Sequence, residues 1–337
     1  MQVQENISLK FYNTFGIDAK AKFFCEINSE KDLADALRLE EYPNKFILSG
    51  GSNMLITKDI EALVLHINIK GITILKENDD HVLLKIMAGE NWHQMVLWTL
   101  EHNYGGLENM SLIPGNTGTA PIQNIGAYGV ELKDTFVSCE GIVLATNKIE
   151  SFYKDDCTFG YRNSVFKEEA KGHYIIINVT FKLKKKNHVL HTSYGAIASQ
   201  LEIMEIKDPT IKDVSDAVVA IRKSKLPNPK DIGNSGSFFK NPVISKNVYN
   251  ALKINFSDIP SYPISNHEVK VPAGWLIEKA GFKGKRFGNY GVHKKQALVL
   301  VNYGGASGED ILNLSKLIKK TIYRLFNISI EAEVNIL

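Results

Sequence analysis

Two groups of glycine and small polar residues in this sequence could hold an anionic ligand through the main chain. The first group follows the short apolar run Phe46 to Leu48 and consists of Ser49, Gly50, Gly51, Ser52 and Asn53. Small residues let a ligand approach the backbone closely, and consecutive free N–H groups in such a turn bind anions. A plain tight turn accounts for the same residues equally well, so this group alone decides nothing.

The second group spans residues 113–129 and has little helical or strand periodicity. Long ordered loops inside a domain are uncommon and usually functional. A flexible surface loop is the alternative, but a disordered loop has no need to bury Ile113, Ile122 and Ile125. The candidate ligand-binding residues of this group are Ile113, Pro114, Gly115, Thr117, Gly118, Gln123, Asn124, Gly126, Ala127 and Tyr128.

Other common ligand sites are not supported. No G-x-G-x-x-G follows a strand and no G-x-x-x-x-G-K-[ST] is present, which argues against a Rossmann dinucleotide site and an NTPase P-loop. The cysteines, Cys25, Cys139 and Cys157, are too few and too scattered for a disulfide framework, and we interpret them as buried thiols. His188 and His191 have no third ligand in view, so no metal site is expected.

The composition is that of an ordinary globular protein of two or three domains. Of the 337 residues, 44% are hydrophobic and 23% are charged, and the formal net charge is only +3. Mixed charges without a basic stripe argue against a nucleic-acid partner. The N-terminus does not resemble a signal peptide, and no apolar run reaches the roughly 18 residues of a membrane helix. A cytoplasmic location with no membrane contact is therefore expected.

The apolar pattern predicts the elements that must position these loops. Helices are expected to begin at Ser29 and Ser307, where Asp32 and Asp310 complete the capping signal. Two further helices are predicted by apolar residues at helical spacing; they run from Trp92 to Leu100 and from Ile211 to Lys225. Strands are predicted over residues 46–48, 63–67, 82–87, 141–145, 174–183, 297–301 and 328–337.

Taken together, the two glycine groups resemble the pyrophosphate-binding loops of flavoproteins with the vanillyl-alcohol-oxidase type of FAD fold. More closely, nearly the full chain resembles the UDP-N-acetylenolpyruvoylglucosamine reductase family of bacterial cell-wall synthesis, and the segment around Tyr194 resembles the tyrosine loop of its first type. Many ordered motifs carry this resemblance besides the two loops; they lie at residues 13–17, 160–166, 233–242, 273–277, 292–293, 296–299 and 333–334. One departure is Ser49, where the family often has a third glycine.

The resemblance implies an α+β protein. The expected architecture is an FAD-binding fold of the vanillyl-alcohol-oxidase (PCMH) type in two regions, followed by a substrate-binding domain. Region one would comprise residues 1–68 and 327–337, region two residues 69–205, and the substrate-binding domain residues 206–326. A monomer is expected.

The resemblance also implies a reaction and its residues. NADPH would reduce non-covalently bound FAD, which would pass the hydride to the enolpyruvyl group of a nucleotide sugar and give UDP-N-acetylmuramate, a peptidoglycan precursor. Arg162 would hold the carboxylate or the developing enolate, since a guanidinium is always charged and binds a carboxylate bidentately. Ser237 would donate the proton, and Glu333 would share the enolate stabilisation as a protonated acid or through a water.

Substrate-binding positions follow from the same resemblance. Tyr194, Lys225 and Asn241 match positions that contact the diphosphate and sugar, and Tyr161, Lys283 and Gln296 are secondary candidates. Lys225 can also be read as a cation that stabilises the C-terminus of its helix. Two other functions stay open at this stage. One is a flavin oxidase of the same fold, and the other is a non-catalytic regulator that binds the nucleotide sugar.

Overall fold

The computed structural model describes every residue from Met1 to Leu337. Its internal contacts divide the chain into two units, each assembled from separate stretches of sequence. Unit 1 consists of Met1–Ile7, Ala21–Gly50 and Ile60–Ser224, and unit 2 of Ser8–Lys20, Gly51–Asp59 and Lys225–Leu337. The three-region division expected from the sequence groups residues by the ligand they serve, which is a different criterion, and it stays a prediction.

The first sheet of unit 1 has parallel strands next to a helix. Its strand order is β1-β2-β5-β3, and β5 (Ile60–Ile67) pairs in parallel with β2 (Lys20–Ile27) and β3 (Lys45–Leu48), while β1 covers Val3–Ser8. Helix α1 (Glu30–Leu37) begins as predicted at Ser29, whose hydroxyl accepts a hydrogen bond from the Asp32 amide. The first glycine group therefore starts at the carboxyl end of a parallel strand.

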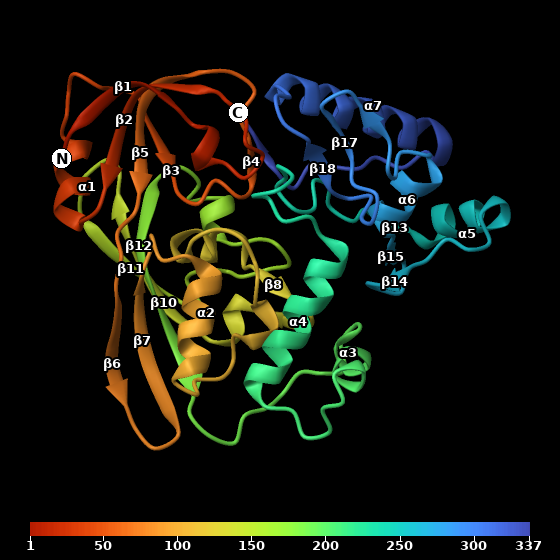
Figure 1. Ribbon diagram of the computed structural model, residues 1–337, viewed down its shortest axis with the longest axis horizontal. Coiled ribbons are helices and arrows are strands. Elements are labelled where there is room, and N and C mark those ends of the chain that lie inside the picture. Colours follow the sequence, from red (N-terminus) through yellow and green to blue (C-terminus); the bar gives the residue numbers. More distant parts are fainter. The chain divides into compact units, whose positions relative to one another are not determined.

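The second sheet of unit 1 is antiparallel and has a core on each face. Its strand order is β11-β10-β12-β7-β6, and β6 with β7 forms the long hairpin in Figure 1. Ile175 and Ile177 of the central β12 join a core with Leu65 and α1, whereas Val179 and Phe181 join a core with Trp92. Burial on both faces explains the continuous apolar run of β12. The strand bounds are β6 (Ile72–Glu77), β7 (His81–Met87), β10 (Phe136–Val143), β11 (Ile149–Tyr153) and β12 (Tyr174–Lys184).

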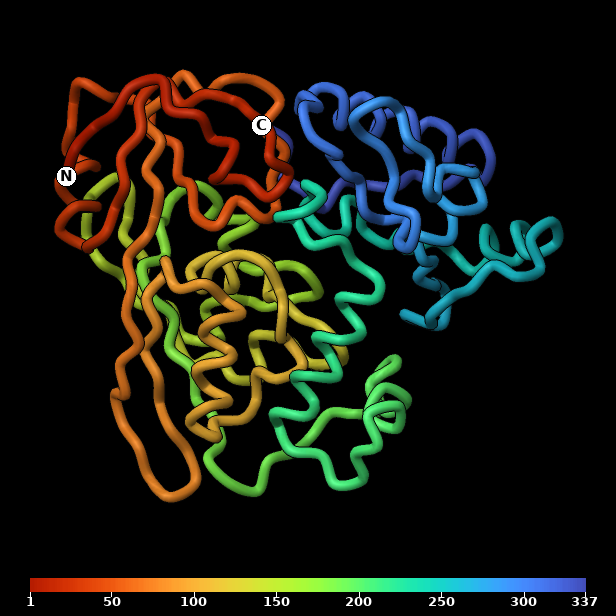
Figure 2. Tube along the Cα trace, in the orientation of Figure 1, coloured from red at the N-terminus to blue at the C-terminus, as the bar shows by residue number.

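Helix α2 (Trp92–Glu101) supports the second glycine group. Trp92, Met95 and Val96 are buried against the antiparallel sheet, which confirms their predicted core role. Figure 2 traces the segment that follows α2 as a series of short turns in gold and yellow beside the helix. These turns contain the 3-10 helices η2 (Glu108–Met110), η3 (Thr117–Thr119), η4 (Pro121–Gln123) and η5 (Leu132–Asp134) and the short strands β8 (Gly126–Ala127) and β9 (Val130–Glu131).

Unit 1 is completed by elements that follow the sheets. Helix α4 (Ile211–Lys225) has the predicted bounds, and Val214, Ala217, Val218 and Ile221 are buried as predicted. The other elements are η6 (Val165–Lys167) and α3 (Ile197–Ile203). The three cysteines are free and buried, as expected.

Unit 2 is built around small sheets and the long helix α7 (Gly308–Phe326), which packs along β17 and β18 (Figure 1). The parallel pair β4 (Met54–Leu55) and β19 (Asn335–Ile336) joins the chain after the first glycine group to the C-terminal residues. The remaining elements are η1 (Lys10–Tyr12), β13 (Val243–Ser245), α5 (Lys246–Asn255), β14 (Tyr262–Pro263), β15 (Glu268–Lys270), α6 (Ala273–Lys279), β16 (Arg286–Phe287), β17 (Tyr290–Val292) and β18 (Leu300–Asn302). None of the helices in either unit has the length and apolarity needed to cross a bilayer.

Two strand predictions in unit 2 are wrong in extent. Only Asn335–Ile336 of the predicted closing strand 328–337 is a strand, although Ile328, Ile330 and Val334 are buried. These side chains are buried by packing without a continuous ladder, and an apolar pattern does not distinguish the two cases. Likewise, the predicted strand 297–301 is mostly a buried turn, and β18 begins at Leu300.

The start of α7 offers a test of the predicted cap. The Ser307 hydroxyl accepts a hydrogen bond from the Asp310 amide at 3.1 Å, and the Asp310 carboxylate accepts one from the Ser307 amide at 2.9 Å. Ser307→Ala removes the first bond and should lower the free energy of unfolding by about 1 kcal/mol, measured by urea denaturation. Lys320→Ala, at an exposed position of the same helix, is the control and should change it by less than about 0.5 kcal/mol. Equal effects of the two substitutions would contradict the capping role.

Candidate active site

Gly50 of the first glycine group meets the second glycine group within unit 1. A Cβ atom placed on Gly50 would lie 2.9 Å from Gly115 Cα and 3.1 Å from the Asn116 nitrogen. Backbone atoms cannot move aside as a side-chain end can, so residue 50 has to be glycine for the loops to approach this closely. Sequence positions more than sixty residues apart are thereby brought into direct contact.

The first glycine group carries polar atoms that the protein leaves unused. The amides of Gly50, Gly51 and Ser52 donate no hydrogen bond within the protein, and the buried hydroxyl of Ser49 has no partner. Buried polar groups without a partner are rare, and each calls for an explanation. A bound ligand with phosphate oxygens supplies acceptors for such amides and for the hydroxyl, so these residues fit a pyrophosphate.

The second glycine group is held rigidly by the main chain next to α2. The Thr117 amide donates to Glu90 O at 2.8 Å, the Gly118 amide donates to Ala88 O at 3.0 Å, and a Cβ on Gly118 would lie 2.5 Å from the Ala88 Cβ. These two amides are therefore occupied by the protein. Thr117 and Gly118 fix the position of the loop and do not offer free amides to a ligand.

The loop that carries Arg162 is attached to the second glycine group. The buried Asn124 side chain donates to Gly160 O at 3.0 Å, and the Ser164 hydroxyl donates to Ile122 O at 2.8 Å. Arg162 itself has φ of 53°, a left-handed conformation that is uncommon for a residue other than glycine. Such strain persists only where the surroundings fix it, which is typical of functional loops.

The tyrosine loop lies against the end of the same group. A Cβ on Gly129 would lie 3.2 Å from the Tyr194 Cβ, and a Cβ on Gly195 would lie 3.8 Å from the Tyr128 ring. The side chains of Tyr194 and Tyr161 are 61% and 59% exposed, so both aromatic rings are accessible to a ligand. Unit 1 thus brings together Tyr128, Tyr161, Arg162 and Tyr194.

Ser237 and Glu333 are brought together inside unit 2. The Glu333 amide donates to Phe238 O at 2.8 Å, the Lys240 amide donates to Glu331 O at 2.9 Å, and Phe239 forms a β-bridge with Ala332. Residues 238–240 and 331–333 are therefore antiparallel neighbours. This pairing places the residue after Ser237 beside Glu333, although nearly one hundred positions separate them in the sequence.

The end of the first glycine group joins this pair. The Asn53 side-chain amide donates to Glu333 O at 3.4 Å, and the Asn335 amide donates to Asn53 O at 3.1 Å. The Ser235 hydroxyl donates to Met54 O at 3.2 Å. The serine loop, the C-terminal segment and residues 53–54 thus form one hydrogen-bonded cluster in unit 2.

The other substrate candidates of unit 2 have local partners. Asn241 Oδ1 accepts the Ala273 amide at 2.9 Å at the start of α6, and Gln296 Oε1 accepts the Leu298 amide at 3.3 Å. Lys283 forms an ion pair with Glu278 at 2.9 Å. Lys225 is exposed at the end of α4. The structure gives Asn241 and Gln296 fixed orientations, whereas Lys283 already has a carboxylate partner.

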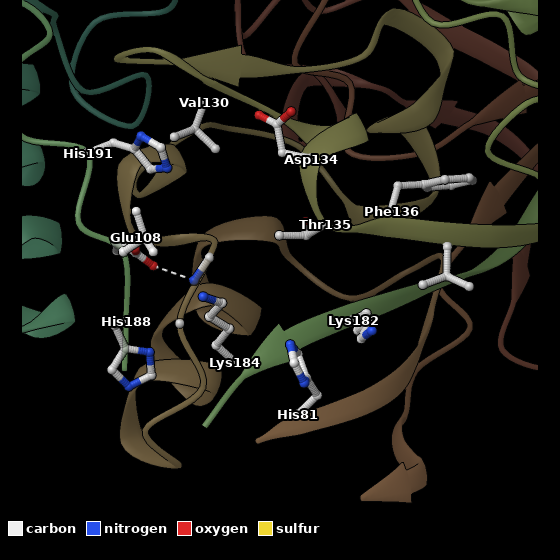
Figure 3. A pocket seen from close by; sticks show the side chains of 14 residues that line it. His81, Glu108, Val130, Asp134, Thr135, Phe136, Lys182, Lys184, His188 and His191 are labelled. Atoms are coloured by element: carbon white, nitrogen blue, oxygen red, sulfur yellow. Dashed lines mark hydrogen bonds between the residues drawn. The ribbon is translucent and has the colours of Figure 1, made fainter. Parts of the chain in front are cut away.

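A cavity of about 360 Å³ in unit 1 contains none of the predicted site residues. Figure 3 shows His188 and His191 on one side of it and His81 with Lys182 on the other. The Glu108 carboxylate at its edge accepts a hydrogen bond from the Gly106 amide at 2.6 Å. The glycine loops do not line this cavity, so we assign it no part in the reaction.

One charged residue of this region was missed by the sequence analysis. Arg222 lies on α4 four residues after Val218 and seven after Ser215, and both of these are buried. A charge at this spacing falls on the apolar stripe of the helix. That spacing is the signal that could have identified Arg222.

Comparisons with known proteins decide the family. Residues 21–152 match the family model of the FAD binding domain, and residues 228–337 match that of the UDP-N-acetylenolpyruvoylglucosamine reductase C-terminal domain. The UDP-N-acetylenolpyruvoylglucosamine reductase of Flavobacterium johnsoniae is 58% identical over 337 residues, covering 100% of both chains. The chain belongs to the UDP-N-acetylenolpyruvoylglucosamine reductase family. The enzyme of the same name from Amoebophilus asiaticus is 45% identical, again over 100% of both chains.

A solved structure confirms the fold expected for this family. UDP-N-acetylenolpyruvylglucosamine reductase from Thermus caldophilus superimposes with a TM-score of 0.69 at 21% identity, covering 100% of this chain and 99% of that one. The predicted α+β fold, with an FAD-binding part and a family-specific C-terminal domain, is thus confirmed. The chain is a flavin oxidoreductase of the UDP-N-acetylenolpyruvoylglucosamine reductase family with FAD as its cofactor.

Gly50→Ala tests the contact between the glycine loops. The added methyl group meets backbone atoms, so the loops must separate, and FAD affinity should fall by at least tenfold, measured from the fluorescence of released flavin. Gly141→Ala in β10 is the control, because its Cβ would make only ordinary contacts at 3.5 Å. FAD binding by Gly50→Ala at the wild-type level would contradict the close contact of the loops.

His93 on α2 makes stability depend on pH. Burial, together with the nearby Lys223 and Arg222, lowers the pKa of His93, and its Nδ1 accepts the Leu112 amide at 3.0 Å. Because the unfolded chain takes up this proton near pH 6.5 and the folded chain only at lower pH, stability is lost as pH falls below about 6.5.

His93→Gln should remove this dependence. The slope of unfolding free energy against pH, measured by urea denaturation between about pH 7.5 and 5.5, should fall by up to about 1.4 kcal/mol per pH unit. Glutamine can still accept the Leu112 amide. The exposed His173→Gln is the control and should leave the slope unchanged; equal slopes for His93→Gln and wild type would be the contrary result.

Proposed function

We propose that this enzyme uses NADPH and non-covalently bound FAD to reduce UDP-N-acetylglucosamine enolpyruvate to UDP-N-acetylmuramate, a step in peptidoglycan precursor synthesis. Membership of the reductase family supports the reaction, and the pairing of residues 238–240 with 331–333 is the observation that carries the assignment of its residues. We further propose that the enzyme acts as a monomer in the cytoplasm.

Bound FAD supplies a hydride that originates from NADPH. When this hydride adds to the methylene carbon of the enolpyruvyl group, the carbon–carbon π electrons move to the adjacent carbon and its carboxylate. The protein has to stabilise this negative charge and deliver one proton to that carbon. These two requirements define the roles of the catalytic residues.

Arg162 is proposed to bind the carboxylate. A guanidinium keeps its charge and offers two parallel N–H donors to a carboxylate, so it stabilises the substrate and binds more strongly as the enolate develops. The attachment of its loop to Asn124 and Ser164 fixes its position relative to the second glycine group. Orientation by a rigid loop reduces the entropy lost in the transition state.

Ser237 is proposed to donate the proton. Its hydroxyl makes no hydrogen bond within the protein, so the proton is not committed to another acceptor. The preceding Gly236 has φ of 67°, and its amide donates to Asn234 Oδ1 at 3.0 Å, which fixes the turn that presents Ser237. An enolate is basic enough to accept a proton from an alcohol when nearby donors stabilise the alkoxide.

Glu333 is proposed to share the stabilisation of the enolate, as a protonated acid or through a water. Its backbone is fixed by Phe238 and Asn53, so its half-buried side chain starts from a defined position beside the serine loop. Tyr194, Lys225 and Asn241 are proposed to bind the diphosphate and sugar, with Tyr161, Lys283 and Gln296 in secondary positions.

Separate measurement of the two half-reactions tests this function. Anaerobic NADPH should bleach the yellow enzyme, and the enolpyruvyl nucleotide sugar should restore the colour. Ser237→Ala should leave bleaching by NADPH within about twofold of wild type and slow the reoxidation by about 10²–10⁴-fold, the usual contribution of a proton donor. Stopped-flow absorbance of the flavin measures both rates.

Ser235→Ala is the matched control, since it removes a hydroxyl that bonds to Met54 O and lies two residues away. It should lose stability without changing the ratio of the two rates. Equal slowing of both half-reactions by Ser237→Ala would contradict the proton-donor role. If oxygen reoxidises the reduced flavin and the enolpyruvyl substrate does not, the protein is an oxidase. If the nucleotide sugar binds but the reduced flavin is not reoxidised, the protein is a regulator.

A further inference from the structure

The side chain of Asn109 bridges two loops of unit 1. Asn109 lies in η2 and is 1% exposed, and its Nδ2 donates hydrogen bonds to Tyr128 O at 3.0 Å and to His191 O at 2.8 Å. Tyr128 belongs to the second glycine group, and His191 lies three residues before Tyr194 in the tyrosine loop, residues 189–196. One buried amide is therefore bonded to both loops.

The chemistry of the two partners fixes the orientation of this amide. Both are carbonyl oxygens, which accept hydrogen bonds and cannot donate them, so the NH₂ end of Asn109 has to face them. The Oδ1 end is buried and accepts no hydrogen bond. The side chain is thus held between the loops by its two donors alone. An aspartate or a leucine has a similar size, but an ionised aspartate only accepts and a leucine does neither.

The tyrosine loop has little else to fix its position. His191 O is the only main-chain group of residues 189–194 that bonds to another part of the chain. Leu190 and Ala196, near the two ends of the loop, pack against an apolar cluster formed by α3 and α4, whereas the side chain of Tyr194 is exposed. Apolar packing has no preferred direction. The bond from the bridging amide is therefore the directional contact that sets where the loop lies.

The other end of the bridge is the turn against which Tyr194 packs. Tyr128 and Gly129 connect β8 to β9 with φ of 50° and 83°, the left-handed pair that a tight hairpin turn requires. A Cβ on Gly129 would lie 3.2 Å from the Tyr194 Cβ, so this turn and the tyrosine loop are in direct contact. By bonding to both, Asn109 fixes the position of Tyr194 relative to the second glycine group.

We propose that Asn109 is a positioning residue that holds the tyrosine loop in the place from which Tyr194 binds the nucleotide sugar. This inference rests on the proposed function, in which Tyr194 contacts the diphosphate and sugar. Asn109 itself is buried and acts through Tyr194. A binding group that is held in place before the ligand arrives loses less conformational freedom on binding, so the bridge strengthens the affinity for the nucleotide sugar. FAD depends on it less, because Thr117 and Gly118 hold the second glycine group independently.

Four variants test this role in the full-length enzyme loaded with FAD. Asn109→Ala removes both donors of the bridge. Asn147→Ala is the matched control, because Asn147 also donates to a main-chain carbonyl, Ala34 O at 3.1 Å, and also has a buried Oδ1 without a partner, but lies between β10 and β11. Tyr194→Ala and the double variant Asn109→Ala/Tyr194→Ala complete a double-mutant cycle, which measures whether the two residues act together.

Two affinities are measured without turnover. FAD affinity is obtained from the fluorescence of released flavin, and nucleotide-sugar affinity from the change in flavin absorbance on titration with UDP-N-acetylmuramate. Asn109→Ala should weaken binding of UDP-N-acetylmuramate by about tenfold or more and FAD binding by less than about threefold, since a binding group out of place by about 1 Å can lose most of its effect. In the Tyr194→Ala background, Asn109→Ala should weaken nucleotide-sugar binding by less than about twofold, because the residue that it positions is already absent.

Several results would overturn the proposal. These are nucleotide-sugar affinity of Asn109→Ala within about twofold of wild type, an equal loss for both ligands, an equal loss in Asn147→Ala, or the full loss persisting in the Tyr194→Ala background. Tyr194→Ala with wild-type affinity would overturn it too, because Asn109 would then have no residue to act through. If Asn109→Ala does not fold, Asn109→Ser takes its place. Its short hydroxyl cannot serve both carbonyls, so wild-type affinity in that variant would be contrary.

Failure of the proposed function itself would be visible separately. It would appear as wild-type enzyme that NADPH does not reduce or that the enolpyruvyl substrate does not reoxidise, whereas the positioning role is judged from affinities alone.

Discussion

The pairing of the serine loop with the C-terminal segment is the constraint on which unit 2 depends. Backbone hydrogen bonds join residues 238–240 to 331–333, and Asn53 bonds to the same C-terminal segment. Main-chain bonds fix position more tightly than long side chains can, because no rotamer freedom remains to be lost. The backbone segments that carry Ser237 and Glu333 thereby acquire a defined spacing before any substrate arrives.

Unit 1 reaches the same result by close contact between glycines. Gly50 and Gly115 approach so closely that neither loop can shift without the other, and Asn124 ties the Arg162 loop to the second glycine group. The loops are rigid because their backbone groups are bonded at positions such as Thr117 and Gly118, while the amides of Gly50 to Ser52 are left for a ligand. The second glycine group therefore supplies rigidity, and the first supplies free hydrogen-bond donors.

The spacing of apolar residues in the sequence predicted the helices and strands that are buried on one face or on both faces. The bounds of α4, the cap of α7, and the strands β7 and β12 follow from apolar spacing and capping residues. The edge strand β6 was not predicted. Almost all of its residues are exposed, so its sequence does not need the alternation of apolar and polar residues that marks a half-buried strand. The site residues came from the family resemblance; spacing alone does not reveal that Phe238 pairs with Glu333, since non-local pairing leaves no local signal.

Among the polar atoms that the fold leaves without a partner, the Ser49 hydroxyl is the one that bears on function, because it lies in the first glycine group. The Ser49 hydroxyl in the first glycine group and Arg222 Nε on α4 are both buried without a hydrogen bond. Each lowers the stability of the ligand-free protein, because the water lost on burial is not replaced. A ligand that binds there replaces the lost hydrogen bonds, and this gain strengthens its binding. The ligand-free fold is thus less stable than it could be, and the Ser49 hydroxyl places part of this deficit where the oxygens of a phosphate would lie.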